Sequence, residues 1–285
     1  MMHPILINIF TALIFIVALG FPSSSSNAYV LQGNHILHLA VKKIESRSNL
    51  SAVQTLTIYE SDSNGANAEF EETVNYNFPK QFRSDLLTGQ TSKIHIFSKN
   101  EAITIFNNTI SSNPESELDH YKDLLLFRNR SLLEERLALL GVDISISSLG
   151  RFQNRIFYIV GAKYPDETLP QVWIEKETFL PTRYLLVEKS KSAIDSIIEF
   201  RYLSWMKTEK TWYPMRVETY VDEKLVRTID VKSIDTNPIF KNDLFDIAHL
   251  KTLYPSVTPD PYDRNKADAL EEVQQSIEDF KKRFE

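Results

Sequence analysis

The sequence predicts an α+β protein whose main element is a long antiparallel β-sheet. Apolar and polar residues alternate with a period of two through most of the chain, and few segments repeat with helical spacing. Such alternation is typical of antiparallel sheets with one wet face, because strands of parallel sheets are buried on both faces and read as continuous apolar runs. No change of composition divides the chain before residue 255. We therefore expect one sheet with an apolar face that few helices cover.

The N-terminal segment predicts export. Residues 5–19 are almost continuously apolar, and no Lys, Arg, Asp or Glu lies in or before them. Ser26 and Ala28 place small residues at the −3 and −1 positions before Tyr29, as in a signal-peptidase site. We interpret 1–28 as a signal peptide cleaved after Ala28. The alternative is an uncleaved anchor, but the apolar run is shorter than the about 20 residues that usually span a bilayer.

The composition excludes several classes of function. The 285 residues include no cysteine, so disulfides, thiolate nucleophiles, cysteine-based metal sites and a lipidated N-terminal cysteine are excluded. The 7 glycines are too widely spaced for the glycine-rich motifs of nucleotide-binding folds and of the nucleophile elbow. With 32 Lys and Arg against 38 Asp and Glu, the net charge of −6 argues against nucleic-acid binding.

The expected elements follow the chain in order. A first helix is predicted by Ile36, Ala40 and Ile44, with Asn34 placed to cap it. Strands of the first half are predicted around Leu56/Ile58, Phe70/Val74/Tyr76, Phe82/Leu86, Ile94/Ile96 and Ile103/Ile105. Two helices, 117–128 and 131–140, then interrupt the strands. Strands of the second half are predicted around Ile156/Tyr158/Val160, Val172/Ile174, Tyr184/Leu186, Ile198/Phe200/Tyr202, Met215/Val217 and Ile229/Val231.

The C-terminal region differs from the rest. Residues 255–285 read as a proline-rich linker followed by an amphipathic helix, in which apolar residues follow helical spacing: Leu270, Val273, Ile277, Phe280 and Phe284. This helix either packs on its own domain or forms a seam for a partner. We therefore divide the chain into the signal peptide, a domain over 29–254 and this tail.

Candidate metal and catalytic sites are weak. His35 and His38 lie three positions apart on the first helix, but no third ligand is spaced to join them, so a solvated helix face explains them equally well. Residues 60–71 partly match a calcium-binding EF loop, yet a β-hairpin turning at Asn64-Gly65 is favoured. No spacing assembles a catalytic acid–base pair or triad. We expect no metal, no cofactor and no enzymatic activity, and a hydrolase with an unrecognised site is the remaining catalytic alternative.

Aromatic residues are concentrated on or beside the strands of the second half. They are Trp173, Phe179, Tyr184, Phe200, Tyr202, Trp205, Trp212 and Tyr213. They form either an ordinary core or the concave face of a curved sheet that the helices only partly cover. The second possibility would leave a cleft for a lipid-like ligand.

Several short segments occur in the same order as in a known family. The segments are Leu50–Thr57, Tyr76–Arg83, Ile94–Ile105, Val172–Arg183, Trp212–Glu218 and Asn237–Asp246. On their shared order, residues 31–247 resemble the LolA-type outer-membrane lipoprotein-sorting family of periplasmic carriers. The resemblance implies an open, incomplete antiparallel β-barrel, a curved sheet with helices plugging its concave face, to which the C-terminal helix is added. It also implies a periplasmic location.

The resemblance implies a carrier that binds the acyl chains of lipoproteins or lipids in an apolar cavity and moves them toward the outer membrane. The candidate cavity residues are Leu56, Ile58, Val74, Tyr76, Phe82, Ile94, Ile96, Val172, Ile174, Ile198, Phe200, Tyr202, Met215 and Val217. The candidate lid residues are Leu124, Leu125, Leu132, Leu133 and Leu137. Lipoprotein-sorting components of the inner and outer membranes are the implied protein partners, and a monomer is expected.

One position departs from the family pattern. Members typically carry an arginine just before the proline of the segment that here reads Phe78-Pro79, where it bonds to the lid and governs release. Because Phe78 stands there and Arg83 is out of alignment, that release mechanism does not carry over. The alternative function is an envelope sensor or scaffold on the same fold, acting through protein partners.

Overall fold

The computed structural model describes residues 30–44, 49–59, 67–88, 91–189, 195–209 and 211–256. The predicted signal peptide, the Asn64-Gly65 turn with most of the EF-like segment, and the predicted C-terminal helix lie outside the described residues. Among the described helices, none is both long and apolar enough to cross a membrane.

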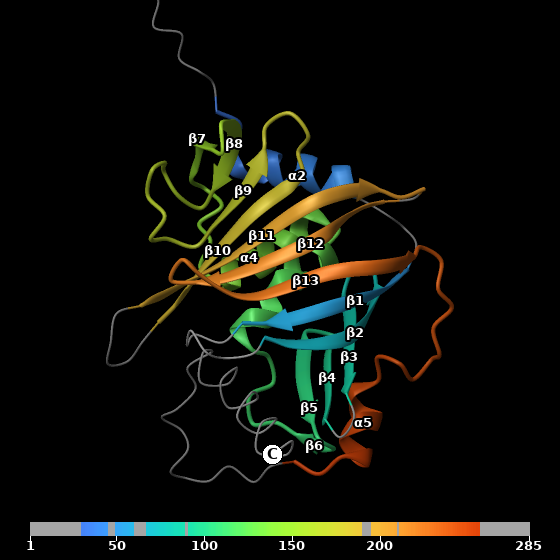
Figure 1. Cartoon of the computed structure of the whole chain (residues 1–285). Helices are drawn as coiled ribbons and strands as arrows, with labels where there is room; N and C mark the ends of the chain where they lie inside the picture. Colours follow the sequence, from blue (N-terminus) through green and yellow to red (C-terminus); the bar gives the residue numbers. More distant parts are fainter. Residues whose placement is uncertain are drawn as a thin grey trace, which may run out of the picture. The chain divides into compact units, whose positions relative to one another are not determined.

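All described strands belong to one antiparallel sheet (Figure 1). Its 13 strands are β1 (Leu50–Ile58), β2 (Ala68–Asn77), β3 (Gln81–Thr88), β4 (Thr91–Ser98), β5 (Glu101–Phe106), β6 (Thr109–Ile110), β7 (Ser147–Phe152), β8 (Arg155–Val160), β9 (Gln171–Glu175), β10 (Pro181–Glu188), β11 (Ser196–Lys207), β12 (Trp212–Val221) and β13 (Lys224–Asp235). Strands β6 and β7, at the two ends of the order, do not pair with each other. The predicted open, incomplete antiparallel barrel is therefore confirmed.

The chain starts in the middle of the sheet, builds one half outward to its edge, and then builds the other half from the opposite edge back to the middle. Strands β1 to β6 are added consecutively toward one edge, and β7 to β13 run from the opposite edge to a position beside β1. The pairing of β1 with β13 is the only non-consecutive contact in this strand order. The helical segment between β6 and β7 must therefore cross from one edge of the sheet to the other, which lays it across the concave face.

Tight two-residue turns connect several hairpins. Both turn residues have positive φ in Lys99-Asn100, Asn107-Asn108, Gln153-Asn154 and Asp222-Glu223. Positive φ at both central positions is the geometry of type I′ turns, whose twist matches that of the flanking strands. Asn and Asp tolerate this conformation better than other non-glycine residues, so the chain makes these turns without using its few glycines.

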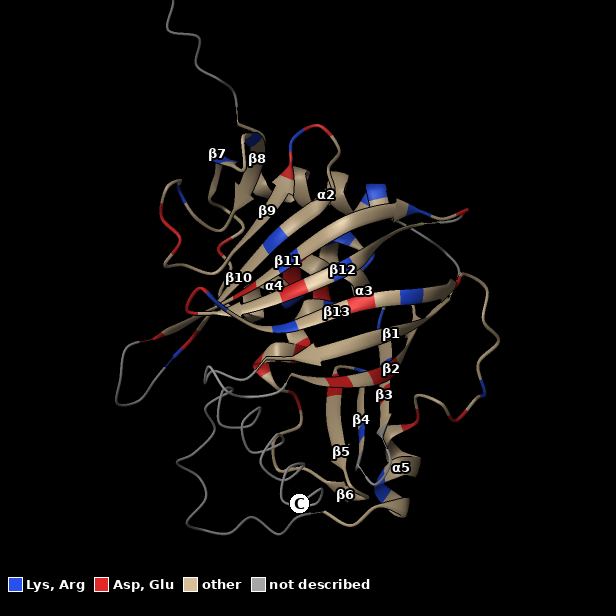
Figure 2. Ribbon diagram, viewed as in Figure 1, with Lys and Arg blue, Asp and Glu red and all other residues tan. Residues whose placement is uncertain are grey.

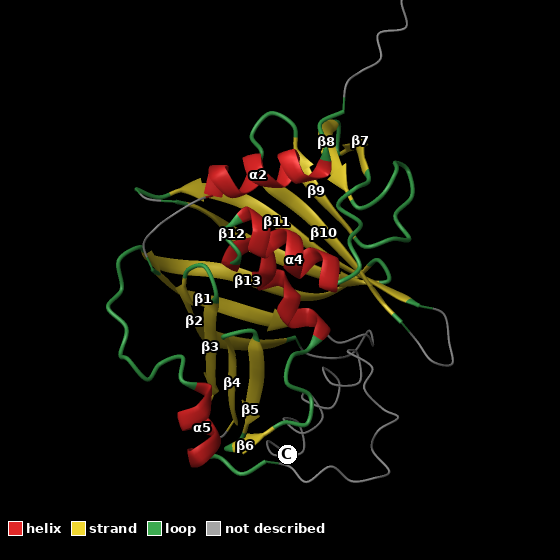
Figure 3. Cartoon of the chain, turned by 180° about the vertical axis from the view of Figure 1, so that it is seen from behind, coloured by secondary structure: helices red, strands yellow, loops and turns green. Residues whose placement is uncertain are grey.

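The helices are α2 (Gly33–Ile44), the 3₁₀ helix η1 (Glu117–Lys122), α3 (Asp123–Leu126), α4 (Arg130–Leu139) and α5 (Ile247–Leu253). Figure 3 shows α2 and α4 lying across the concave face of the sheet, whereas α5 lies near β3 and β4. The predicted helices over 36–44 and 131–140 are confirmed. The predicted helix 117–128 is instead a 3₁₀ helix followed by one α-helical turn.

Local capping explains why this helical segment is broken. The side chain of Ser116 accepts a hydrogen bond from the η1 backbone, and that of Asp119 accepts one from the Ser116 backbone N–H. Phe127 then leaves helical geometry, with φ −81° and ψ 74°, and the Asn129 side chain accepts from Leu132 N–H to begin α4. The sequence analysis did not predict α5, β6 or β7.

The main apolar core lies between the concave face and the helices. Its innermost helical residues include Ile36 and Leu37 of α2 and Leu137 of α4, all with exposed fractions of 0%. A second cluster joins strands β4 to β6 to Ile247 and Leu250 of α5, so part of the sheet is covered on both faces. A third cluster on β8, β9 and β10 centres on Trp173.

Charged residues recur along the central strands (Figure 2), and several of them form ion pairs with one another. Arg216 of β12 pairs with Glu218 and with Asp230 of the neighbouring strand, at 2.9 and 2.7 Å. Arg201 of β11 pairs with Glu199 at 2.7 Å. The one-sided alternation that predicted the sheet therefore has a direct structural counterpart in these strands.

Candidate functional site

Most predicted cavity residues lie together on the concave face. The main core contains Leu56, Val74, Tyr76, Phe82, Val172, Ile174, Ile198, Phe200, Tyr202 and Val217, and Ile58 packs against it. Four predicted lid residues, Leu124, Leu125, Leu133 and Leu137, belong to the same core, and Leu132 packs against it. The apolar surfaces of both halves of the sheet thus meet the predicted lid.

Three predicted cavity residues lie elsewhere. Ile94 and Ile96 belong to the second cluster, under α5, whereas Phe97 of the same strand faces the main core. Because successive side chains of a strand alternate between faces, Ile94 and Ile96 point away from the helices of the concave face. Met215 is half-buried and is not among the core residues of the described chain. These three are left out of the ligand-binding surface proposed below.

Residues 117–139, here called the plug, occupy the concave face. Leu124, Leu125 and Leu126 have exposed fractions of 1% or less. A ligand that binds this face must therefore replace plug side chains.

A small number of polar contacts tie the plug to the strands. Tyr202 of β11 donates a hydrogen bond from its hydroxyl to the carbonyl oxygen of Tyr121, at 2.7 Å. Arg227 of β13 donates to the carbonyl oxygen of Leu118. These contacts hold η1 against the centre of the sheet through backbone acceptors.

Arg128 forms a further link between the plug and the sheet. Its Cζ atom lies 3.7 Å from the centroid of the Phe78 ring, and its Nη1 donates to Thr211 Oγ1 at 2.6 Å. Thr211 in turn donates to the carbonyl oxygen of Ile44, at the end of α2. At the position where the resemblance led us to expect an arginine, Phe78 supplies an aromatic ring, and the guanidinium comes from the plug. The sequence alone carried no signal that pairs these two residues.

A buried ionic cluster joins residues of the plug to Glu115, which lies just before it in the chain. Arg136 Nε lies 2.9 Å from Asp123 Oδ2, and Arg136 Nη2 lies 2.9 Å from Glu115 Oε2. Lys122 also pairs with Glu115, and its Nζ is 3.9 Å from Asp123 Oδ1. Asp123 and Lys122 are completely buried. Sequence reasoning missed this cluster because Arg136 is separated by a turn from the acidic residues it contacts.

His120 joins this cluster. Burial by itself would lower the pKa of His120, but hydrogen bonds to Asp123 and Glu117 raise it to about 9. Arg136 Nη2 lies 2.9 Å from His120 Nδ1, a contact between two cations when the imidazole is protonated. The carboxylates of Glu115, Glu117 and Asp123, all within 3.9 Å of the ring nitrogens, outweigh it.

A second polar group seats η1 on β4 and β5. Asp119 lies 3.5 Å from Lys93 Nζ, and Thr104 Oγ1 lies 3.0 Å from His95 Nδ1. Burial opposes ionisation of Asp119, but Lys93 and other neighbouring cations hold its pKa well below the usual range. Burial lowers the pKa of His95 to about 4, so this imidazole is neutral at pH 7.

The geometry does not favour a metal in the plug. Glu115, His120 and Asp123 each offer an atom within 4.8 Å of the others. Lys122 and Arg136 already contact the same carboxylates, so two protein cations take the role that a metal ion would have. The predicted pair His35 and His38 lies on the exposed face of α2 with ring centroids 6.3 Å apart.

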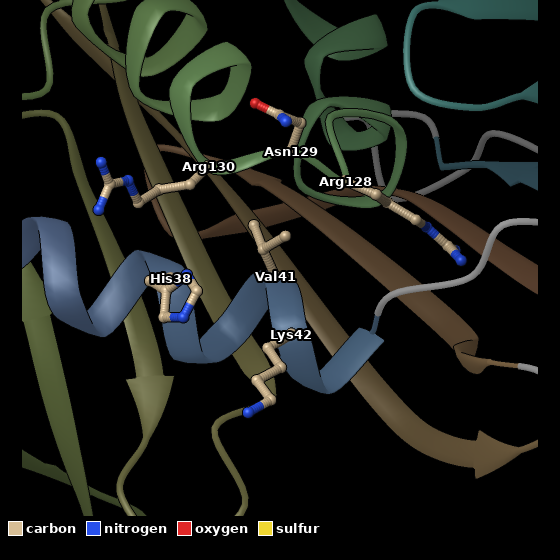
Figure 4. Close-up of a pocket in the computed structure, with 6 residues that line it drawn as sticks. All are labelled: His38, Val41, Lys42, Arg128, Asn129 and Arg130. Atoms are coloured by element: carbon tan, nitrogen blue, oxygen red, sulfur yellow. The ribbon is translucent and has the colours of Figure 1, made fainter.

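A groove lies between α2 and the start of α4. Its cavity of about 370 Å³ is lined by His38, Val41, Lys42, Arg128, Asn129 and Arg130 (Figure 4). Sequence reasoning did not identify it, because its two walls are about 90 residues apart in the chain.

Comparison with known proteins supports the fold. No protein-family model and no curated protein matches the chain. A domain from Vibrio parahaemolyticus assigned to the outer membrane lipoprotein-sorting proteins superposes with a TM-score of 0.51, at 10% identity, over 76% of this chain and 97% of that chain. A DUF1329 family protein from Desulfovibrio piger superposes with a TM-score of 0.50, at 12% identity, over 77% and 98%. The chain therefore has the LolA-like open-barrel fold, and the resemblance is confirmed at the level of the fold.

Proposed function

We propose that this protein is a non-enzymatic periplasmic carrier that binds acyl chains of lipoproteins or lipids on the concave face of its sheet. The observation that supports the proposal is the arrangement of one apolar face, built from both halves of the sheet, under a plug of short helices. The similarity to the fold of a lipoprotein-sorting domain supports it as well.

The energetics of exchange are compatible with binding and release. Burying a chain of about 14 carbons contributes about 11 kcal/mol at about 0.8 kcal/mol per methylene. Exposing the four buried plug leucines 124, 125, 133 and 137 costs about 6–12 kcal/mol at about 1.5–3 kcal/mol each. The two terms nearly balance, so a chain can enter without being bound irreversibly.

The first experiment measures whether the mature protein binds a neutral acyl ligand. The full chain is expressed so that it is exported, and the processed protein is purified and analysed by native mass spectrometry with lipid extraction. In a separate measurement, 1-monomyristoylglycerol is titrated into the protein by calorimetry. The proposal predicts co-purified or exchangeable lipid and saturable binding. Absence of both would refute it.

The second experiment locates the ligand. A photo-reactive benzoylphenylalanine replaces Phe179, which packs against the main core, and in a matched control it replaces Tyr164, which is 46% exposed. An acylated peptide should cross-link at position 179 and not at position 164. Equal cross-linking at both positions would place the ligand on the outer surface instead of the concave face.

A further inference from the structure

Two hydrogen-bond donors interrupt the apolar concave face near the middle of the sheet. Tyr202 of β11 and Arg227 of β13 have exposed fractions of 1% and 7%. Tyr202 is in register with Val217 of β12, and Arg227 with Thr219 of the same strand, so the two donors lie in adjacent rows on either side of β12. Val217, between them, belongs to the main apolar core. The donors are therefore polar groups set into an apolar surface.

Both donors bond to backbone carbonyl groups of the plug. The Tyr202 hydroxyl donates to the carbonyl oxygen of Tyr121 at 2.7 Å, and Arg227 Nη2 donates to that of Leu118. Leu118 and Tyr121 lie three positions apart in η1, which is one turn of a 3₁₀ helix, so their carbonyl groups are about 6 Å apart along the helix axis. These two bonds use the plug only as a source of carbonyl oxygens.

The seated plug leaves hydrogen-bonding capacity unused at this place. Arg227 Nε has no hydrogen-bond partner in the described chain, and the contact of its Nη2 with Thr219 Oγ1 is long, at 3.5 Å. The hydroxyl of Tyr121, which the plug brings into the core, is also buried without a partner among the described residues. A buried donor without an acceptor is costly. A ligand that offers a carbonyl oxygen here would satisfy Arg227 at least as well as the plug does, whereas a bare hydrocarbon would leave both sheet donors unpaired.

We propose that Tyr202 and Arg227 bind the acyl carbonyl group of a ligand that displaces η1 from the concave face. This inference rests on the proposed carrier function and adds the class of ligand, which is a lipid with an ester or amide carbonyl and not a free hydrocarbon or an ether lipid. The carbonyl oxygens of Leu118 and Tyr121 occupy the donors until a ligand carbonyl replaces them. The acyl chain then extends over the apolar residues around the donors.

The test compares two lipids that differ only in this carbonyl group. Calorimetry measures binding of 1-monomyristoylglycerol, which is an ester, and of 1-O-tetradecylglycerol, the ether with the same chain length and the same head, to the mature protein. We expect the ester to bind at least about tenfold more tightly, because the ether offers the buried donors no carbonyl oxygen. A factor of ten corresponds to about 1.4 kcal/mol.

Conservative variants test the two donors. Tyr202→Phe keeps the shape of the side chain and should lower the preference for the ester by at least about threefold, and Tyr202→Phe/Arg227→Met should abolish the preference. The control Tyr213→Phe also removes a buried hydroxyl from this face, but the partner of that hydroxyl is Tyr76 on the sheet, at 3.3 Å, so the preference should remain. A purely structural role of Tyr202 would change the affinity for both lipids equally. If the double variant does not fold, Tyr202→Phe decides alone.

The outcomes separate the two proposals. Equal affinity of the wild-type protein for the ester and the ether would overturn the carbonyl site and leave the carrier function intact. Loss of the preference in Tyr213→Phe as well would also overturn it. An acetylated pentaalanine amide has carbonyl groups and no long chain, and it should bind far more weakly than the ester; equally tight binding that depends on Tyr202 would assign the donors to peptide carbonyls instead. Failure of both lipids to bind would remove the carrier function and the inference with it.

Discussion

The substitution Asp123→Asn tests whether the buried ionic cluster holds the plug. Asp123 is fully buried and accepts from Arg136 Nε at 2.9 Å, and it lies within 3.4 Å of the His120 ring. Asparagine keeps the shape of the side chain and removes its charge. Glu115 would then be left to balance Lys122 and Arg136, while Glu117 still faces the His120 ring.

The expected cost follows from burial. Removing one partner of a buried ion pair typically costs about 3–5 kcal/mol, because the remaining charge stays uncompensated. Exposed pairs contribute about 0–1 kcal/mol. The control is Glu101→Gln, which removes the partner of Lys251 in a pair whose side chains are each about half exposed.

Urea unfolding at pH 7 measures both variants, with circular dichroism as the signal. We expect Asp123→Asn to lower the free energy of unfolding by about 3–5 kcal/mol. Glu101→Gln should change the free energy by less than about 1 kcal/mol. A loosened plug should also be displaced more easily, so Asp123→Asn should bind 1-monomyristoylglycerol faster. A cost no larger than that of the control would refute the view that this cluster holds the plug.

Three further predictions concern the plug and the tail. The free energy of unfolding should fall by about 3 kcal/mol as pH rises from about 6.5 to 9, because the folded pKa of His120 is about 9 and each pKa unit corresponds to about 1.4 kcal/mol. Urea unfolding of His120→Gln at the same pH values should not show this fall. Phe78→Leu should cost about 1–2 kcal/mol in urea unfolding, since it removes the ring under the buried Arg128 guanidinium; an unchanged midpoint would contradict a contribution from this contact. Deletion of residues 262–285 should leave acyl-chain binding intact if the protein is a carrier, whereas loss of a protein partner with unchanged lipid binding would support the sensor alternative.

Local patterns were enough to predict the elements that make up the face. The alternation around Val172/Ile174 and Ile198/Phe200/Tyr202 predicted strands whose apolar side lies in the main core. Helical spacing and Gly141 predicted α4 with nearly its observed ends. These features depend on a period of two or of about 3.6 within a single element, so each can be read without knowledge of its neighbours.

Other features depend on contacts between distant parts of the chain. Alternation around Ile94/Ile96 shows that the strand has two faces, but only the docking of α5 decides that these residues lie away from the plug. The contact of Arg128 with Phe78 likewise joins segments that no local pattern links.

The sequence by itself therefore determined an antiparallel sheet with an apolar face and helices to cover it. Tertiary structure alone decided that β1 pairs with β13, which makes the segment after β6 cross the concave face as a plug. It also decided that cations of α2 and of the start of α4 line one groove. The physical reason is that periodicity is a property of one element, whereas strand order, plug position and groove charge are properties of how elements pack.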